Sequence, residues 1–347
     1  PDEGRPRIAV VGGGSAAETF ARSVADAADL IVFEPALVGG ECPFVACMPS
    51  KSMLHDARVG AAWRDAVERR RSITDDLDDH DHAADLEAIG ARLVRETAHL
   101  VGPHSLAAGR AQHDVDHIVL ATGCEPLLPD IDGLDVCRDR IWTSADVYRS
   151  TERPDRVAVI GAGVIGFEVA DLYAGFGTEV TVIDRGQRSF DTIPPDVARV
   201  VVDAVTSRNV VVRYDVEAAA IAPVDRPGDD AVELTLSDGE VIEVDRVVVA
   251  IGRRPRTDGI GLDAVGLDPS EPLPVDSNGR VRCEGSVWAM GDVAGMGQYT
   301  HLANHHAAVV ADHLVGTRTR TFDEVVLGSC MFTAPPLIQV GPQWSEL

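Results

Sequence analysis

The sequence predicts an α/β protein with two similar domains, each a parallel sheet with helices plus a small antiparallel meander. A short apolar run, a glycine-rich turn, a helical segment and a second apolar run follow one another near the start of the chain, and the same order returns from Arg156. At 347 residues the chain is long enough to form two or three hydrophobic cores.

Composition narrows the classes of partner and location. Hydrophobic residues make up 45% of the chain, and no apolar run approaches the roughly 20 residues that span a bilayer. The formal net charge of −25 argues against nucleic acid and membranes as partners, because phosphate binding needs a positive surface. Residues 1–7 contain no apolar targeting segment and the chain has only 6 Cys, so we expect a cytoplasmic protein without a disulfide scaffold.

The first repeat carries the fingerprint of a dinucleotide-binding turn. Residues 7–11 form the apolar run, and Gly12, Gly14 and Ala17 follow in the spacing Gly-x-Gly-x-x-Ala. The first glycine allows a tight turn, the second lets the backbone approach a pyrophosphate, and the third small residue packs helix on strand. Glu34 ends the second apolar run, where a carboxylate can accept a hydrogen bond from a ribose hydroxyl.

The second repeat has the complete form of the same fingerprint. After the apolar run of residues 156–160 comes Gly-x-Gly-x-x-Gly, made by Gly161, Gly163 and Gly166. Two fingerprints predict two Rossmann-like domains that bind two dinucleotides. Asp184, at the end of the next apolar run, favours NAD(H), because a carboxylate there would repel a 2′-phosphate. Arg185 and Arg188 keep NADP(H) as the alternative.

Two cysteines lie where thiols become reactive. Cys42 and Cys47 are separated by four residues, on a glycine-led turn that enters a helix expected to begin near Pro49. Backbone N–H groups at a helix start lower a thiol pKa and make it a better nucleophile. Lys51, the only lysine in the chain, lies one helical turn beyond Cys47. The residues alone leave three other interpretations open, namely two core cysteines, a structural disulfide, or half of a metal site.

Other elements are predicted from local patterns. Residues 72–85 hold two histidines among aspartates, which we interpret as a solvated loop or an exposed helix end rather than a metal site. Residues 124–156 are rich in proline, aspartate and glycine, which suggests a linker. We further expect a long helix over 52–71, a helix within 86–94, strands at 115–120, 210–214, 232–236, 241–243, 247–251 and 287–290, and a helix over 301–314.

Together these motifs resemble the family of flavin-dependent pyridine nucleotide–disulfide oxidoreductases. That family includes dihydrolipoamide dehydrogenase, glutathione reductase, mercuric reductase and the soluble transhydrogenase. The resemblance covers nearly the whole chain in the family's order, through VVGGGSAAE, GGECPFVACMPSK, IVLATG, VAVIGAGVIGFEVA, VVVAIGRRP, VWAMGDVAG and HLANHHAAVVADHL. It implies an enzyme that passes electrons between NAD(P)H, FAD, a Cys42–Cys47 disulfide and a small disulfide or dithiol.

The resemblance also implies roles for single residues. Cys42 is implied to exchange with substrate and Cys47 to lie next to the flavin, while Lys51 is implied to lie near the flavin and to pair with Glu168. The implied FAD residues are Gly12, Gly14, Ala17, Glu34, Gly40, Lys51, Thr122, Gly123, Asp292 and Ala303. The implied nicotinamide nucleotide residues are Gly161, Gly163, Gly166, Asp184, Arg185 and Gly252. No metal ligand is implied.

The implied domain order is discontinuous. An FAD domain is expected over residues 1–150 and 269–323, with an NAD(P) domain, residues 151–268, inserted between them. Residues 324–347 resemble the start of a dimerisation domain, which implies a homodimer. The family's catalytic His-Glu pair is expected beyond Leu347, so we expect the native enzyme to be longer. The chain departs from the family at Ala46, where glycine is usual.

Two alternative functions stay open. The same fold could reduce a non-disulfide acceptor, such as Hg(II), a quinone or a nicotinamide nucleotide. A non-catalytic flavin-binding protein is the other alternative. The joint presence of Cys42, Cys47, Lys51 and Glu168 argues against a decayed site. The motifs assign neither the disulfide substrate nor the physiological direction.

Overall fold

Two units make up the chain, and each gathers three separate segments. The computed structural model describes residues 4–190, 192–226, 230–316 and 320–341. Unit 1 consists of Pro1–Phe44, Leu77–Glu125 and Arg254–Val325, and unit 2 consists of Val45–Asp76, Pro126–Arg253 and Val326–Leu347. The ends of the predicted segments 1–150 and 324–347, at residues 1–3 and 342–347, lie outside the described residues. The predicted domain boundaries stay a prediction.

Unit 1 is built on a five-stranded parallel sheet with the order β18-β7-β1-β2-β3. Its central strand, β1, is apolar on both faces from Ile8 onward, as expected for a strand covered on both sides. A three-stranded antiparallel sheet, β4-β5-β6, accompanies it. The strands are β1 (Arg7–Val11), β2 (Asp29–Phe33), β3 (Arg92–Val94), β4 (Ala98–Gly102), β5 (Ser105–Ala108), β6 (Ala111–Asp114), β7 (His117–Leu120) and β18 (Val287–Ala289).

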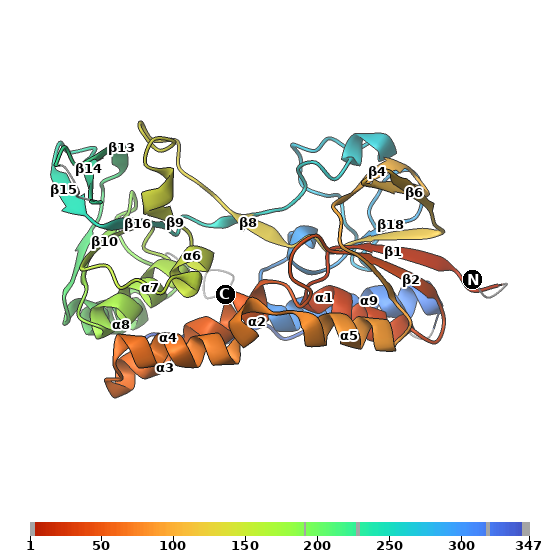
Figure 1. Ribbon diagram of the computed structural model, residues 1–347, viewed down its shortest axis with the longest axis horizontal. Coiled ribbons are helices and arrows are strands. Elements are labelled where there is room, and N and C mark those ends of the chain that lie inside the picture. Colours follow the sequence, from red (N-terminus) through yellow and green to blue (C-terminus); the bar gives the residue numbers. More distant parts are fainter. Residues whose placement is uncertain (1–3, 191, 227–229, 317–319, 342–347) are drawn as a thin grey trace. The chain divides into compact units, whose positions relative to one another are not determined.

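Helices cover one face of this parallel sheet and the antiparallel sheet covers the other (Figure 1). Helices α1 and α9 pack against each other, and Phe20 of α1 and Val309 of α9 share one core with Leu106 of β5. The helices of unit 1 are α1 (Ser15–Val24), α2 (Glu41–Phe44), α5 (His80–Ala88) and α9 (Thr300–Val315), with short 3-10 helices η3 (Leu262–Val265) and η4 (Gly291–Ala294). The sheet is therefore the middle layer of unit 1.

Unit 2 repeats the arrangement with the parallel order β12-β11-β10-β16-β9 and the antiparallel sheet β13-β14-β15. Side chains of β10 alternate between two cores. Val157 and Val159 pack with the helices, whereas Ala158 and Ile160 pack with the antiparallel sheet. The strands are β9 (Ile141–Trp142), β10 (Arg156–Ile160), β11 (Glu179–Ile183), β12 (Val210–Arg213), β13 (Ala218–Pro223), β14 (Val232–Leu236), β15 (Val241–Val244) and β16 (Arg246–Val249).

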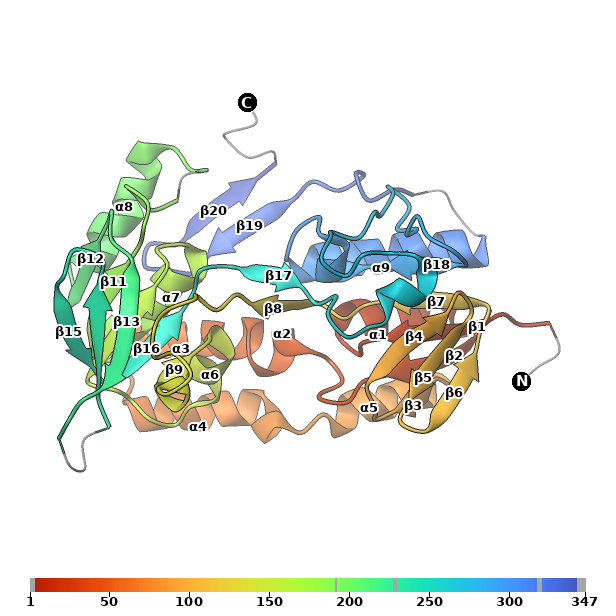
Figure 2. The same ribbon diagram turned by 90° about the horizontal axis from the view of Figure 1, so that it is seen from above.

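Helix α7 is the central helix of unit 2, packed on β10 and β11 and against α3 (Figure 2). Its approach to α3 is close, since a Cβ added at Gly175 would lie 2.9 Å from the Cβ of Ala57. The helices are α3 (Cys47–Val59), α4 (Trp63–Ile73), α6 (Ser144–Arg149), α7 (Val164–Gly175) and α8 (Pro195–Thr206), with 3-10 helices η1 (Asp75–Leu77) and η2 (Arg138–Arg140).

Two short strand pairs complete the structure. β19 (Gly328–Met331) and β20 (Leu337–Val340) form an antiparallel hairpin, and β8 (Cys124–Pro126) pairs with β17 (Arg253–Pro255). Two parallel sheets with helices and small antiparallel sheets confirm the predicted α/β class. In the described parts of the chain, no helix is both long and apolar enough to cross a bilayer.

The expected single helix over residues 52–71 is wrong. Helix α3 ends at Val59, because Gly60 turns into the left-handed region with φ 71° and its N–H bonds back to the carbonyl of Asp56. Glycine in that conformation is a common helix terminator. Helix α4 then starts at Trp63. Helix α3 begins at Cys47 rather than near Pro49, so Cys47 itself is the first helical residue.

Two further local expectations are corrected. The helix expected within 86–94 ends at Ala88 and gives way to β3, and it begins at His80, inside the expected polar loop. The expected linker over 124–156 contains helix α6. A capping box between Thr143 and Asp146 starts that helix, a signal that the proline-rich composition obscures.

His306 of α9 should make the protein sensitive to acid. Its ring is fully buried and stacks on Phe322 with centroids 3.7 Å apart. Burial, with a smaller contribution from His305, lowers the pKa of His306 to about 4. The unfolded chain therefore takes up a proton first, so stability is fully present above about pH 6.5 and falls by up to about 3 kcal/mol as pH drops to about 4.

Urea unfolding at a series of pH values checks this expectation. The variant His306→Leu should lose that part of the pH dependence, while the exposed control His80→Gln should keep it. Equal pH slopes in wild type and His306→Leu would show that this ring does not cause the acid sensitivity.

Candidate functional site

Each unit carries a glycine turn at the carboxyl end of its central strand. Gly12 and Gly161 have φ of 105° and 110°, which favour glycine. A Cβ at Gly12 would overlap the carbonyl oxygen of Ala121, and one at Gly161 would overlap that of Ala250. Both turns therefore require glycine for reasons internal to the protein, and the two units repeat the same contact.

An acidic side chain holds each glycine turn. Glu34 Oε2 accepts a hydrogen bond from the backbone N–H of Gly13 at 2.8 Å. In the second unit, Asp184 Oδ2 accepts from the N–H of Ala162 at 2.6 Å. The other oxygen of each carboxylate accepts from the N–H two positions further along the chain. Since a carboxylate oxygen accepts two hydrogen bonds, each group can still bind a ribose hydroxyl.

Gly14 and Gly163 differ from the first glycines of their turns. Their φ values of −76° and −88° suit any residue. A Cβ at Gly163 would have nothing within 4 Å, and the nearest atom to one at Gly14 would be the Cα of Gly40 at 3.8 Å. The protein itself does not need glycine at either position. Open space beside the first N–H groups of α1 and α7 fits the pyrophosphate of a dinucleotide in both units.

Other residues expected to bind FAD converge on the same end of unit 1. Gly40 lies against the glycine turn, since a Cβ there would be 2.9 Å from the Cα of Gly14. Ala303 and Ala16 both line the backbone next to Asp292, because a Cβ at Gly291 would lie 3.5 Å from the first and 3.4 Å from the second.

Thr122 and Gly123 follow β7, which lies next to β1. The hydroxyl of Thr122 donates to the carbonyl of Arg256 at 2.7 Å, and the N–H of Arg256 donates to the carbonyl of Gly123 at 2.9 Å. These bonds join the end of β7 to the segment around Arg256. Ala17 is fully buried in the α1 packing face, as its place in the fingerprint predicts.

The remaining residues expected to bind the nicotinamide nucleotide lie in unit 2. A Cβ at Gly166 would overlap the carbonyl oxygen of Gly161, so this glycine allows α7 to pack closely on the turn. Gly252 has φ 117° and follows β16, the neighbour of β10. The side chain of Arg185 is exposed to solvent next to the half-buried Asp184.

The two cysteines lie on consecutive helices. Cys42 is in α2, at the end of a segment of unit 1, and Cys47 is the first residue of α3 in unit 2. Both side chains are half-buried. Ala46 stands just before α3, at the position where the family usually has glycine. Pro49, which has no N–H to leave unbonded, suits the first turn of α3.

Lys51 and Glu168 form the expected ion pair. Lys51 Nζ lies 3.5 Å from Glu168 Oε2, with the two side chains 35% and 9% exposed. Lys51 is one turn beyond Cys47 on α3, and Glu168 is in the second turn of α7. The packing of α3 on α7 therefore brings a cation near the thiol end of α3.

Sequence reasoning missed Tyr148, a neighbour of this ion pair. Burial raises the pKa of Tyr148 well above its usual value, the Glu168 carboxylate raises it further, and a hydrogen bond with Ser50 opposes them. The phenol is thus a neutral hydrogen-bonding group at neutral pH. No local signal marks it, because it lies in the stretch interpreted as a linker.

Sequence reasoning also missed Phe332. Its backbone N–H donates to Glu168 Oε1 at 2.7 Å, and the centroid of its ring is 4.5 Å from Lys51 Nζ. It follows β19 in the last segment of unit 2. Nearby, burial raises the pKa of the Cys330 thiol, and Glu168 adds to that shift.

The polar run of residues 72–85 also makes contacts within unit 1 through His82. His82 Nδ1 lies 2.8 Å from the buried Glu18 Oε1, and the ring meets Phe44 edge-on with centroids 5.4 Å apart. A Cβ at Gly39 would lie 3.0 Å from the His82 ring. His82 thus supports the turn that leads to Cys42. Among the residues described, no three His, Cys, Asp or Glu side chains are grouped so as to hold a metal ion.

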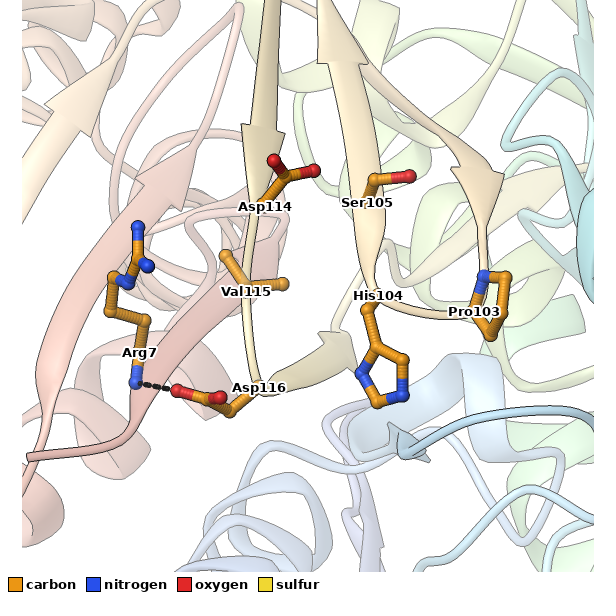
Figure 3. Close-up of a pocket in the computed structure, with 7 residues that line it drawn as sticks. All are labelled: Arg7, Pro103, His104, Ser105, Asp114, Val115 and Asp116. Atoms are coloured by element: carbon orange, nitrogen blue, oxygen red, sulfur yellow. Dashed lines mark hydrogen bonds between the residues drawn. The ribbon is translucent and has the colours of Figure 1, made fainter.

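A surface cavity of about 310 Å³ lies elsewhere in unit 1 (Figure 3). Arg7, the first residue of β1, lines this cavity, and its backbone N–H donates a hydrogen bond to Asp116 Oδ2 at 2.7 Å. The cavity is lined by Arg7, Pro103, His104, Ser105, Asp114, Val115 and Asp116. It therefore lies at the amino ends of β1 and β7, whereas the glycine turn lies at their carboxyl ends, the usual ligand side of a parallel sheet.

Comparison with known proteins agrees with this geometry. Residues 6–310 match the sequence pattern of the family described as pyridine nucleotide-disulphide oxidoreductase. The chain is 30% identical over 331 residues to dihydrolipoyl dehydrogenase 3 of Pseudomonas aeruginosa, covering 88% of this chain and 69% of that enzyme. It is 25% identical over 353 residues to a mercuric reductase of Staphylococcus aureus, covering 96% of this chain and 64% of that enzyme.

The fold matches a solved flavoprotein. The HOCl-induced flavoprotein disulfide reductase of Escherichia coli, in its Cu(II) complex, superposes with a TM-score of 0.91, over 99% of this chain and 78% of that chain. Sequence identity in this match is 23%, so it supports the fold alone.

The two kinds of glycine should respond differently to a methyl group. Gly14→Ala and Gly163→Ala should leave the free energy of unfolding within about 0.5 kcal/mol of wild type, because each side chain enters open space. Gly14→Ala should weaken FAD binding and Gly163→Ala should weaken NADH binding, each by about tenfold or more, because the methyl group occupies room for a pyrophosphate.

Gly12→Ala and Gly161→Ala provide the matched pair. Both should destabilise folding by about 2 kcal/mol or more, through strain and overlap with a backbone carbonyl. Denaturant unfolding and cofactor titration separate the two classes. Unchanged cofactor affinity in Gly14→Ala and Gly163→Ala would remove the evidence for dinucleotides in these turns.

Proposed function

We propose, from the premise that this chain belongs to the pyridine nucleotide-disulphide oxidoreductase family, that it acts as an FAD-dependent oxidoreductase of the dihydrolipoamide dehydrogenase type. It would move electrons between NAD(H) and a small dithiol or disulfide through Cys42 and Cys47. The observation that carries the proposal is the ion pair of Lys51 with Glu168, one helical turn beyond Cys47.

Bound FAD would supply the two-electron exchange between the nicotinamide and the cysteine pair. The turn of unit 1 would hold FAD through the open space at Gly14, with Glu34 accepting from its ribose. Gly12, Gly40, Thr122, Gly123, Asp292 and Ala303 would complete that site, with Lys51 near the flavin. The turn of unit 2 would hold the nicotinamide nucleotide at Gly163, Asp184 and Gly252.

The cysteine chemistry balances within the chain. As a thiolate, Cys42 would attack one sulfur of a substrate disulfide, forming a mixed disulfide and releasing the first substrate thiolate. Cys47 would then attack the sulfur of Cys42, release the second thiolate and close the Cys42–Cys47 disulfide. Two electrons pass from the protein dithiol to the substrate, and the two protons of the dithiol end on the released thiols. The reverse sequence oxidises a dithiol.

Lys51 and Glu168 would act on Cys47. A positive charge near a thiol favours the thiolate, and so does the start of a helix. Glu168 is the more buried partner, and an isolated buried carboxylate is costly, so the pair holds together. The arrangement keeps the cation of Lys51 near the thiol end of α3.

The residue that carries a proton of the dithiol to the leaving thiolate would lie outside this chain's described residues. The curated relatives are longer than the part that this chain matches. From the family resemblance, we propose a homodimer in which a His-Glu pair of the dimerisation domain serves the cysteines. Such a histidine would act as general acid toward the released thiolate.

The nucleotide choice gives a direct prediction. Asp184 would accept a hydrogen bond from the 2′-hydroxyl of NADH and would repel the 2′-phosphate of NADPH, so NADH should exceed NADPH in kcat/KM by about tenfold or more. Asp184→Ser should narrow that ratio, and Arg185→Ala should leave NADH use largely unchanged. Steady-state kinetics with both nucleotides provide the test. A preference for NADPH in wild type would reassign Arg185 and Arg188 as phosphate ligands.

The cysteine roles have their own test in the FAD-loaded protein. Anaerobic NADH should convert Cys42 and Cys47 from iodoacetamide-resistant to alkylated residues, as read by mass spectrometry of the peptides. Cys42→Ser or Cys47→Ser should lower disulfide turnover by about a thousandfold, because the relay needs both sulfurs. Cys283→Ser is the matched control and should retain activity.

A different result would favour the alternative acceptors. If the alkylation pattern does not change with NADH and both variants reduce acceptors as wild type does, the disulfide relay is wrong. Quinones, Hg(II) and nicotinamide nucleotides would then be the acceptors to assay.

A further inference from the structure

One residue of the last segment contacts both members of the Lys51–Glu168 ion pair. Phe332 lies in the turn between β19 and β20. Its backbone N–H donates to Glu168 Oε1 at 2.7 Å, while Lys51 pairs with the other oxygen of that carboxylate. Its ring centroid lies 4.5 Å from Lys51 Nζ. The ammonium therefore has a carboxylate and an aromatic ring as neighbours.

The backbone around Phe332 is held firmly to unit 2. Glu168 and Asp171 lie on one face of α7, three residues apart, and both are buried. Asp171 Oδ2 accepts from the N–H of Ala334 at 3.1 Å. The guanidinium of Arg58, from α3, donates to the carbonyl oxygen of Phe332. Both helices that carry the ion pair thus bind this turn.

Lys51 needs such support because its side chain is long and only partly covered. Lysine carries a flexible four-carbon stem, and its side chain here is 35% exposed. A single ion pair at this degree of exposure restrains a lysine weakly. The face of an aromatic ring attracts a cation within about 6 Å of its centroid, so the Phe332 ring adds a second restraint.

We propose that Phe332 is a positioning residue, which holds the Lys51 ammonium against Glu168 through its ring face and its backbone N–H. Since Lys51 is one turn from Cys47, the ring fixes the position of the cation that would favour the thiolate. The importance of that position rests on the proposed function. The contact itself does not, and it can be measured without any disulfide chemistry.

The composition of the chain provides a specific probe. Lys51 is its only lysine, so acetic anhydride modifies one side-chain amine, and mass spectrometry of the peptide with Lys51 gives the rate. In the FAD-loaded protein, Phe332→Leu should raise that rate by about two- to fivefold, because the ammonium loses the attraction of the ring. Phe332→Tyr should react at the wild-type rate.

A series of fluorinated phenylalanines tests the effect of the ring electrons on Lys51 separately from the effect of side-chain shape. Mono-, di- and trifluorophenylalanine at position 332 keep the ring nearly unchanged in size and progressively weaken its negative face. Acetylation of Lys51 should rise stepwise along the series. Ile338→Ala, on β20 of the same hairpin and 67% exposed, is the control and should match wild type.

Either of two results would overturn the proposal. Fluorinated proteins that acetylate at the wild-type rate would show that the ring does not hold Lys51. An Ile338→Ala protein that reacts as fast as Phe332→Leu would show that a loosened hairpin, and not the ring, exposes the amine. The fluorinated series also serves if Phe332→Leu does not fold.

Kinetics distinguish this inference from the proposed function. Phe332→Leu should lower kcat for disulfide reduction by about two- to fivefold with little change in KM for NADH. If NADH leaves Cys42 and Cys47 of wild type resistant to iodoacetamide but acetylation of Lys51 follows ring fluorination, the proposed function is wrong and the contact stands. If wild type reduces disulfides but the acetylation rate of Lys51 does not change along the fluorinated series, the proposed role of Phe332 is wrong and the proposed function stands.

Discussion

The close approach of two backbone segments at each glycine turn is the constraint from which the rest of the arrangement follows. At Gly12 and Gly161 the turn presses on the carbonyl at the end of a neighbouring strand, leaving no room for a side chain. Only that approach lets the following helix start directly above the sheet, with its first N–H groups facing the carboxyl ends of the strands. The same local contact, present in both units, accounts for two similar glycine turns in one chain.

Helix α7 connects the glycine turn of unit 2 to the Lys51–Glu168 ion pair. Its first residue follows the glycine turn at Gly163, and its second turn presents Glu168 to Lys51. A further turn presents Asp171, whose pKa is raised by burial while Arg208, 2.8 Å away, opposes that shift. A rigid helix transmits a displacement along its whole length. Changes in nucleotide contacts and in the Lys51 environment are therefore expected to be coupled rather than additive.

The parts that could be predicted from sequence are those encoded locally. Both fingerprints sit in uninterrupted strand, turn and helix patterns, and the structure confirms the fold class they predict. The ion pair of Lys51 with Glu168 came from the family resemblance and is present. The break at Gly60 was also local, but the apolar spacing on both sides concealed it, so one helix was expected where two exist.

Contacts between segments that are far apart in the chain could not be predicted from the sequence. Phe332 and Glu168 are 164 positions apart, and His82 and Glu18 are 64 apart. Neither pair leaves a periodic signal, because each depends on how helices and hairpins pack after they form. Tyr148 was hidden for a related reason, since proline and aspartate around it dominated the local composition.

The carboxylates at the ends of β2 and β11 have one more consequence. Glu34 and Asp184 bind the N–H groups of their turns, so hydrogen bonds within the protein hold each turn in place. Association of a dinucleotide at such a turn would cost little ordering entropy, so the interaction energy of its pyrophosphate would contribute to affinity rather than to the ordering of a loop. A turn held in this way would suit both of the proposed cofactors, the flavin and the nicotinamide nucleotide.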